Sequence, residues 1–285
     1  MQSFPLLAGL RLLLVALHLI YGAVLVALLF RLGGVPWRQR LKRIWSRQLL
    51  MLLGIQVESD ESDVFRIDSG LLVGNHISFI DIFVINALLP SGFVAKSEVA
   101  QWPLIGWLCR HNDTVFIERG SRKAAHRTHQ HMLRMLGAGL RLAIFPEGTS
   151  TAGDTLLPFH AALFQSAIDA AVPVHALALS YHRADGTRSE APAYIDDISL
   201  LDCLMTVLRA GGLTARVTLA ASFAPPLPNR RHLAHRAHQA VATALERAHG
   251  AAQALPLIDF NPEKREVNRA EGTAQPLRNE AAIKT

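Results

Sequence analysis

The sequence contains little cysteine: Cys109 and Cys203 are the only two among 285 residues. They form no Cys-x-x-Cys pair and no Cys/His cluster with the spacing of a zinc site. We therefore expect neither a disulfide framework nor a structural zinc ion. Reduced thiols, as in a cytosolic protein, are the simpler interpretation.

Other patterns are also missing. The Gly-x-Ser-x-Gly elbow of a serine hydrolase is absent. Aromatic residues make up only 7% of the chain, and no nucleic-acid recognition motif accompanies the basic residues, so a nucleic-acid binder is the weakest hypothesis. The chain is instead rich in apolar residues, at 50%, and carries a formal net charge of +6. A basic balance favours anionic partners such as phospholipid headgroups or acidic carrier proteins, without choosing among them.

The longest apolar run lies near the N-terminus, where residues 12–30 carry no charge. As a helix this run would span about 28 Å, close to the hydrocarbon thickness of a bilayer. A cleaved signal peptide would have a shorter apolar region followed by a small-residue cleavage site. A buried core helix would not require the basic segment that follows. We therefore expect a membrane-anchoring helix.

The segment that follows, residues 31–47, is basic and contains no acidic residue. Its charged side chains are Arg31, Arg38, Arg40, Lys42, Arg43 and Arg47. By the positive-inside rule, everything after residue 31 would lie in the cytoplasm. This predicts a protein of the inner (cytoplasmic) membrane whose residues beyond the anchor face the cytoplasm.

Residues 36–53 predict a second helix, started by Pro36. Its apolar side consists of Trp37, Leu41, Ile44, Trp45, Leu49, Leu52 and Leu53. That pattern fits an amphipathic helix in the membrane interface, and the alternative is an ordinary helix packed on the domain. Residues 1–54 are thus predicted to form a transmembrane helix followed by an interfacial helix.

Beyond Gly54, short apolar runs alternate with helical patterns. Strands are predicted at 71–73, 93–95, 114–117, 140–145, 172–179 and 215–220, and helices near 78–89, 121–137, 160–171 and 229–249. This alternation predicts an α/β fold, a mixed sheet flanked by helices, over residues 55–249. In residues 250–285 the periodicity fades and charged and small residues dominate, which predicts a disordered tail.

The sharpest local pattern is Gly74–Asp81, with the sequence GNHISFID, directly after an apolar run. A histidine with a positioned carboxylate can act as a general base. Residues five apart on a regular helix point about 140° away from each other. His76 must therefore lie in the turn before a helix that carries Asp81 in its first turn, with Ser78 as the N-cap. The alternative is a capping box, Ser78-x-x-Asp81, in which Asp81 only stabilises the start of the helix.

Two further patterns follow predicted strands. Residues 145–150 read Phe-Pro-Glu-Gly-Thr-Ser, a tight turn whose N–H groups and hydroxyls could bind a phosphate or an oxyanion. An ordinary strand-ending turn is the alternative. Residues 115–119 form a short strand that ends on Arg119, a guanidinium suited to bidentate phosphate contact unless it is a plain surface arginine.

The order of these patterns is more specific than any one of them. It resembles the four blocks of the glycerolipid (lysophospholipid) acyltransferase family, and looks closest to the bacterial 1-acyl-sn-glycerol-3-phosphate acyltransferases. The matching elements are His-x4-Asp at 76–81, Phe-Ile-x-Arg at 116–119, Phe-Pro-Glu-Gly-Thr at 145–149 and Val-Pro-Val at 172–174. The resemblance covers residues 36–225, and Lys96 and the Trp-Pro-Leu-Ile-Gly run at 102–106 also resemble that group.

The resemblance implies an enzyme that transfers an acyl group from acyl-CoA or acyl-acyl carrier protein to a lysolipid, most directly 1-acyl-sn-glycerol-3-phosphate. His76 would deprotonate the acceptor hydroxyl and Asp81 would orient His76. The substrate-binding residues implied are Asn75, Ser78, Lys96, Arg119, Glu147, Gly148 and Thr149, with Arg119, Gly148 and Thr149 on the acceptor phosphate and Glu147 shaping that site. Attack on the thioester would be direct, without an acyl-enzyme, and no metal or redox cofactor is implied.

Two departures from the family pattern lie near the implied acceptor side. The family often has Lys-x-Gly where this chain has His160-Ala161-Ala162, and a second Val-Pro where it has His175-Ala176. Both departures concern recognition of the acceptor headgroup rather than the acyl-transfer reaction. The run Leu-Pro-Phe-His-Ala-Ala-Leu-Phe also resembles the lyso-ornithine lipid acyltransferase branch, which makes lyso-ornithine lipid the alternative acceptor.

Two hypotheses from other classes stand beside acyl transfer. A non-catalytic lipid-binding protein would need no base, and a lipid hydrolase would use His76 to activate water. The products separate the three hypotheses: acylated lysolipid, free fatty acid, or neither.

Overall fold

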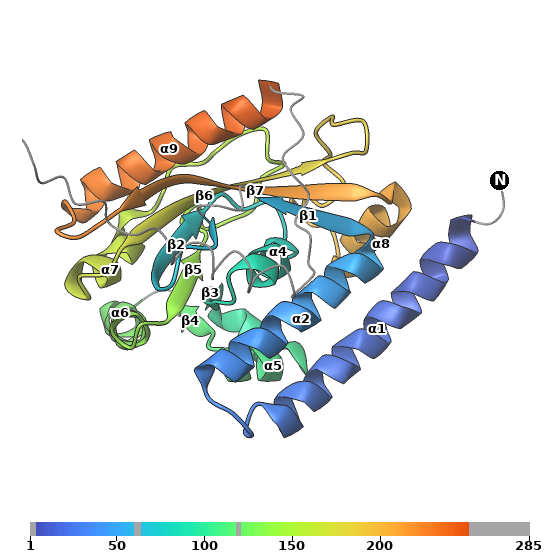
Figure 1. Ribbon diagram of the computed structural model, residues 1–285, viewed down its shortest axis with the longest axis horizontal. Helices are drawn as coiled ribbons and strands as arrows, with labels where there is room; N and C mark the ends of the chain where they lie inside the picture. The colour runs from blue at the N-terminus through green and yellow to red at the C-terminus, as the bar shows by residue number, and fades with distance from the viewer. Residues whose placement is uncertain (1–3, 60–63, 118–120, 251–285) are drawn as a thin grey trace, which may run out of the picture.

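The computed structural model describes residues 4–59, 64–117 and 121–250. Two long helices come first, α1 (Phe4–Leu29) and α2 (Val35–Leu53). Behind them the described residues form one seven-stranded sheet in the order β1-β7-β6-β2-β5-β3-β4. Helices cover both faces of this sheet (Figure 1), and the predicted α/β class with a mixed sheet is confirmed. The predicted tail lies outside the described residues, apart from Gly250.

The strands are β1 (Ile55–Ser59), β2 (Gly70–Gly74), β3 (Gly92–Lys96), β4 (Val115–Ile117), β5 (Arg141–Ile144), β6 (Val174–His182) and β7 (Leu213–Phe223). Strands β2 to β6 run parallel to one another. Strand β7 is antiparallel to β6, and β1 pairs with β7 in parallel. Parallel strands buried on both faces are continuously apolar, which is why the central strands could be recognised in the sequence.

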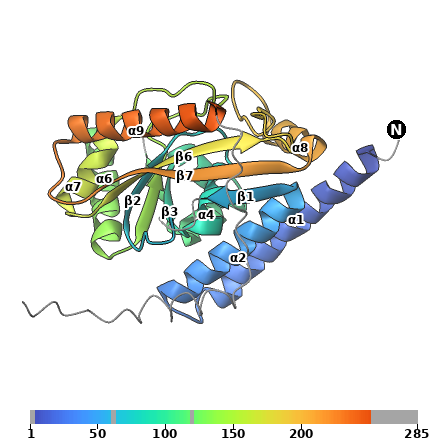
Figure 2. The same ribbon diagram turned by 45° about the horizontal axis from the view of Figure 1, so that its top comes forward.

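The remaining helices are α4 (Asp81–Leu88), η1 (Ser97–Gln101), α5 (Ile105–His111), α6 (Arg122–Gly137), η2 (Ala161–Phe164), α7 (Gln165–Asp169), α8 (Leu200–Ala210) and α9 (Arg230–Gly250). Helices α2, α4 and α8 pack on one face of the sheet, and α6, α7 and α9 on the other (Figure 2). Alternate residues of β2 supply the two cores, Leu72 to the first and Leu71 and Val73 to the second.

Helix α1 lies alongside α2, on the side of the domain away from α9 (Figures 1 and 2). One of its faces is buried, and His18 on that face stacks on Trp45 of α2 with ring centroids 4.9 Å apart. Each of these two residues also hydrogen-bonds the other's backbone carbonyl. The opposite face of α1 exposes Leu13, Leu17, Ile20, Val24 and Leu28. Residues Ala8–Leu29 are long and apolar enough to cross a membrane.

Helix α2 is held on the domain by its basic residues as well as by its leucines. The Lys42 ammonium lies 2.7 Å from the Asp113 carboxylate and donates to the Asn112 carbonyl. Arg43 and Arg47 donate to carbonyls at the end of α4. These three side chains contact protein, as the alternative of a helix packed on the domain requires.

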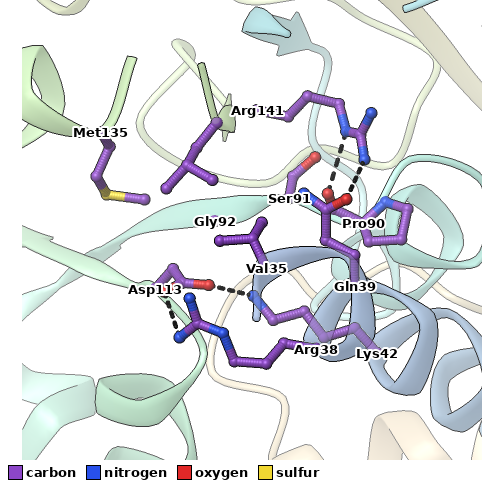
Figure 3. A pocket seen from close by; sticks show the side chains of 11 residues that line it. Val35, Arg38, Gln39, Lys42, Pro90, Ser91, Gly92, Asp113, Met135 and Arg141 are labelled. Atoms are coloured by element: carbon purple, nitrogen blue, oxygen red, sulfur yellow. Dashed lines mark hydrogen bonds and ion pairs between the residues drawn. The ribbon is translucent and has the colours of Figure 1, made fainter. Parts of the chain in front are cut away.

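The space between α2 and the sheet is small and lies away from the predicted catalytic residues. Arg141 at the start of β5 donates to the Pro90 carbonyl and to Gln39 of α2 across a cavity of about 10 Å³, room for one water (Figure 3). This cavity lies at the amino ends of β3 and β5, whereas the sequence patterns with possible chemistry follow the carboxyl ends of strands.

Candidate active site

The candidate site is built where parallel strands end. Asn75 and His76 follow β2, Lys96 ends β3, and residues 145–150 follow β5. Because these strands are parallel, their carboxyl ends meet at the same edge of the sheet, where ligands bind in α/β folds. The sequence patterns separated by up to 75 positions along the chain therefore meet at one edge.

His76 and Asp81 form the centre of this site. His76 lies in the turn between β2 and α4, and Asp81 is the first residue of α4, as the spacing predicted. The His76 Nδ1 atom is 2.9 Å from Asp81 Oδ2. Its side chain is 23% exposed while that of Asp81 is fully buried. Asp81 therefore fixes the proton on Nδ1, and Nε2 is left as the basic nitrogen of the ring.

Asp81 also organises the turn that carries His76. Its Oδ2 atom accepts from the backbone N–H groups of Ile77, at 2.7 Å, and Ser78, at 2.9 Å. One carboxylate oxygen thus binds both the histidine ring and the backbone of the turn. Ser78 is not the N-cap, however. Helix α4 starts after Ile80, and no side chain caps it.

Glu147 connects the turn after β5 to the His76 turn. One carboxylate oxygen accepts from the His76 backbone N–H at 2.7 Å, and the other accepts from that of Leu157 at 2.8 Å. Burial raises the pKa of Glu147, while the two N–H donors oppose this rise. A second connection runs from the Thr151 N–H to the His76 carbonyl, at 2.9 Å. Glu147 thus ties the turn after β5 to the turn that carries His76.

The neighbouring residues Gly148 and Thr149 are exposed at the site edge. Gly148 has a positive φ of 76°, which glycine adopts without strain, and a Cβ there would lie 3.3 Å from the His160 ring. The histidine that departs from the family pattern therefore lies against the turn proposed to bind the headgroup. Lys96 is exposed at the end of β3, and Arg119 lies outside the described residues.

Two of the expected substrate-binding residues are committed elsewhere. The Asn75 side chain donates to the Leu179 carbonyl at 2.9 Å and accepts from the Leu179 N–H at 2.7 Å, which joins β2 to β6. Ser78 is fully buried, beside the Cys203 thiol. Direct contact with substrate does not fit these positions, so we correct their role to holding the site in shape. Burial raises the pKa of Cys203 to about 11, so this thiol stays protonated.

The comparisons with known proteins agree with this geometry. The family model Acyltransferase matches residues 56–180, a range that includes both the His76 turn and the Glu147 turn. The 1-acyl-sn-glycerol-3-phosphate acyltransferase of Neisseria meningitidis serogroup B is 38% identical over 186 residues, 65% of this chain and 72% of that protein. The lyso-ornithine lipid O-acyltransferase of Pseudomonas aeruginosa is 40% identical over 227 residues, 78% of this chain and 86% of that protein. The chain belongs to the acyltransferase family.

The fold of this acyltransferase also has a solved counterpart. The crystal structure of the 1-acyl-sn-glycerophosphate (LPA) acyltransferase PlsC from Thermotoga maritima matches with a TM-score of 0.61. The match covers 87% of this chain and all of that chain at 19% sequence identity. At that identity it supports the fold rather than a substrate.

Sequence reasoning missed two residues of this acyltransferase site. Phe145 stacks on the His76 ring, with centroids 4.1 Å apart and planes 9° apart. Tyr181 on β6 is buried, and its hydroxyl donates to Asp81 Oδ1 at 2.7 Å. Burial, with Asp81 adding to it, raises the pKa of Tyr181 well above its usual value, so the hydroxyl keeps its proton. One signal was available: a tyrosine in a buried strand needs a partner for its hydroxyl.

Proposed function

We propose that this acyltransferase moves an acyl group from the thioester of acyl-CoA or acyl-acyl carrier protein to the free hydroxyl of a lysolipid. The observation that carries the proposal is the His76–Asp81 pair, with the ring partly exposed at the sheet edge. Such a pair suits removal of a proton from a weakly acidic alcohol. A non-catalytic lipid-binding protein would have no use for it.

In the proposed mechanism, His76 Nε2 takes the proton of the acceptor hydroxyl as the oxygen attacks the thioester carbon. Asp81 stabilises the imidazolium that forms. The proton then passes to the departing thiolate, which leaves the new ester and a free thiol. Two groups that could carry an acyl-enzyme near this pair do not suit that role, because Ser78 is fully buried and the Cys203 thiol is buried and protonated. Direct transfer is therefore the simpler route.

For the acceptor we propose 1-acyl-sn-glycerol-3-phosphate, which would give phosphatidic acid. The exposed turn at Gly148 and Thr149 beside the catalytic edge supports a phosphate site, since backbone N–H groups in such turns bind anions. Arg119 and Lys96 would add positive charge to that site. The relative from Neisseria meningitidis carries the name of this activity.

Lyso-ornithine lipid is the second candidate acceptor. Its case rests on the relative from Pseudomonas aeruginosa, which matches more of this chain than the Neisseria protein does. It also rests on His160, whose ring lies against Gly148 where the family often places a lysine. Both acceptors offer one free hydroxyl, so the same base serves either.

We further propose that residues 1–54 hold the enzyme in the inner membrane and that residues 55–249 form the catalytic domain on its cytoplasmic side. The exposed apolar face of α1 supports this, as do Trp37, Ile44 and Met51 on the outer side of α2. A large exposed apolar surface of this kind marks a site for lipid or protein contact.

The deciding experiment incubates membranes that contain the enzyme with labelled acyl-CoA, or with labelled acyl carrier protein, and a panel of lysolipids. We expect labelled phosphatidic acid. Labelled ornithine lipid with no phosphatidic acid would replace the first acceptor by the second. Free fatty acid alone would indicate a hydrolase, and no product with any donor or lysolipid would contradict acyl transfer.

A further inference from the structure

We propose that Tyr181 is a positioning residue for catalysis, which holds the Asp81 carboxylate from the side opposite to His76. The proposal rests on the proposed role of His76 as base. The Tyr181 hydroxyl reaches Asp81 Oδ1 from β6, 100 positions away along the chain. No sequence pattern of the His76 turn includes this residue.

The hydrogen bonds of Asp81 show what Tyr181 contributes. Oδ2 accepts three donors, from His76 and from the N–H groups of Ile77 and Ser78, all of which belong to the same short turn. Oδ1 accepts from the Tyr181 hydroxyl, which comes from strand β6. Tyr181 is thus the link between the carboxylate and the sheet, and it fixes the rotation of Asp81 about its side chain.

Tyr181 acts through Asp81 rather than on substrate. Its side chain is 1% exposed in the core formed by α4, α8 and the sheet, so no substrate atom reaches it. The strand that carries it is tied to the site a second time, because the Asn75 side chain binds both backbone groups of Leu179, two residues earlier. Strand β6 therefore supports both ends of the His76 turn.

The hydroxyl also affects the charge that His76 meets. A donor on Oδ1 draws part of the carboxylate charge away from Oδ2. Without it, Oδ2 would carry more of the carboxylate charge and would hold the imidazolium form of His76 more strongly. The other titratable groups facing the pair are the Glu147 carboxylate, from the turn after β5, and the Cys203 thiol, from α8. Substitution at Tyr181 leaves both in place.

The test is Tyr181→Phe, which removes the hydroxyl and keeps the ring that fills the core. We expect kcat to fall about tenfold with little change in KM, since no substrate contact is lost. We also expect the acidic limb of the plot of kcat/KM against pH to move to higher pH by about one unit. In a second variant, Tyr181 is replaced by a tyrosine with fluorine on its ring. Its hydroxyl is a stronger hydrogen-bond donor, so the acidic limb should move to lower pH.

The matched control is Ser166→Ala, which also deletes a buried hydrogen-bonded hydroxyl, but one whose partner is His129. It should lower the melting temperature and leave the pH profile unchanged. His76→Ala, assayed alongside, separates the two proposals. If His76→Ala retains activity, the proposed base is wrong.

If His76→Ala is inactive while Tyr181→Phe keeps the wild-type kcat and pH profile, the inference about Tyr181 is overturned. A lower melting temperature without a shifted limb would likewise reduce Tyr181 to a packing role. If Tyr181→Phe fails to fold, the fluorinated enzyme decides the question, because an unmoved limb there contradicts the proposal.

Discussion

At the scale of single residues, Asp81 combines two roles that are often separate. It orients a histidine and it closes the turn at the start of α4. The fully buried carboxylate is compatible with this because every oxygen has a donor. Substitutions at this position therefore need to distinguish loss of charge from loss of the turn.

His76→Ala and Asp81→Asn make that distinction. We expect His76→Ala to abolish transfer, since general-base catalysis contributes about 10²- to 10⁴-fold. An asparagine oxygen in the place of Oδ2 could still accept the two backbone N–H groups, so Asp81→Asn should fold. It should nevertheless be severely impaired, because an amide cannot stabilise the imidazolium as a carboxylate does. Labelled acyl transfer and thermal melting in detergent check both points. Near-normal activity in Asp81→Asn would show that Asp81 only stabilises the turn and has no part in catalysis.

Glu147→Gln tests the connection between the two turns. The carboxylate accepts two N–H groups, one on each oxygen, whereas an amide has one oxygen and would set its own NH₂ against a donor. Leaving a buried donor unpaired costs about 1–3 kcal/mol. We expect a lower melting temperature together with a lower kcat. Glu190→Gln, at a mostly exposed glutamate, is the control. Equal behaviour of the two variants would show that the connection is dispensable.

At the scale of elements, the sequence predicted those strands and helices whose pattern follows from their surroundings. The central strands are continuously apolar because both faces are covered. β1 was missed because three of its five residues, in the sequence Ile-Gln-Val-Glu-Ser, are polar. Its Glu58 is buried only because Arg216 on β7 pairs with it at 3.0 Å. Such a partner lies 158 positions away and leaves no local signal.

Helix α8 was missed for a different reason, since its signal was present. Ser199 caps it by accepting from the Asp202 N–H, the spacing that marks a helix start. Within the site, the His76–Asp81 pair follows from local spacing and was predicted. Tyr181 and the Glu147 connection depend on how β6 and β5 flank β2, which no local pattern contains.

The attachment of α2 can be tested at Lys42 and Asp113. The Lys42 side chain is 6% exposed and that of Asp113 is 30% exposed, so the pair is only partly shielded from water. Burial lowers the pKa of Lys42, and Asp113 opposes this. We expect Lys42→Met to destabilise the protein by about 1–2 kcal/mol, because it removes the donor to the Asn112 carbonyl and leaves the Asp113 carboxylate with the more distant Arg38, at 3.8 Å.

Asp113→Asn added to Lys42→Met should restore part of that loss, since asparagine tolerates the positive φ of this position. A double-mutant cycle on melting in detergent measures the coupling. Strictly additive effects would show that the ion pair does not hold α2.

At the scale of the whole molecule, α1 has two faces with different roles. The face with Val15 and His18 packs on the rest of the protein, whereas the face with Leu17 and Val24 is exposed. We expect the intact enzyme to stay in the membrane on alkaline carbonate extraction. Release of the intact protein would contradict the proposed anchoring.

A pair of matched substitutions on α1 separates anchoring from packing. Leu17→Asn places a polar group on the exposed face and should weaken retention in the membrane without lowering the melting temperature. Val15→Asn places the same group where the side chain is 4% exposed and should lower the melting temperature instead. If both variants behave alike in extraction and in melting, the two faces do not have the roles given to them.

The double attachment of β6 to the catalytic turn also limits where the chain can change its length. Leu179 meets Asn75, and Tyr181 meets Asp81 on the same face of the sheet. Because side chains alternate along a strand, one residue inserted between them would turn the tyrosine toward α9 on the opposite face. A change of length is instead compatible with both attachments in the connection after His182, where β6 has ended and α8 has not begun. A longer loop introduced there by engineering would leave the catalytic turn in place.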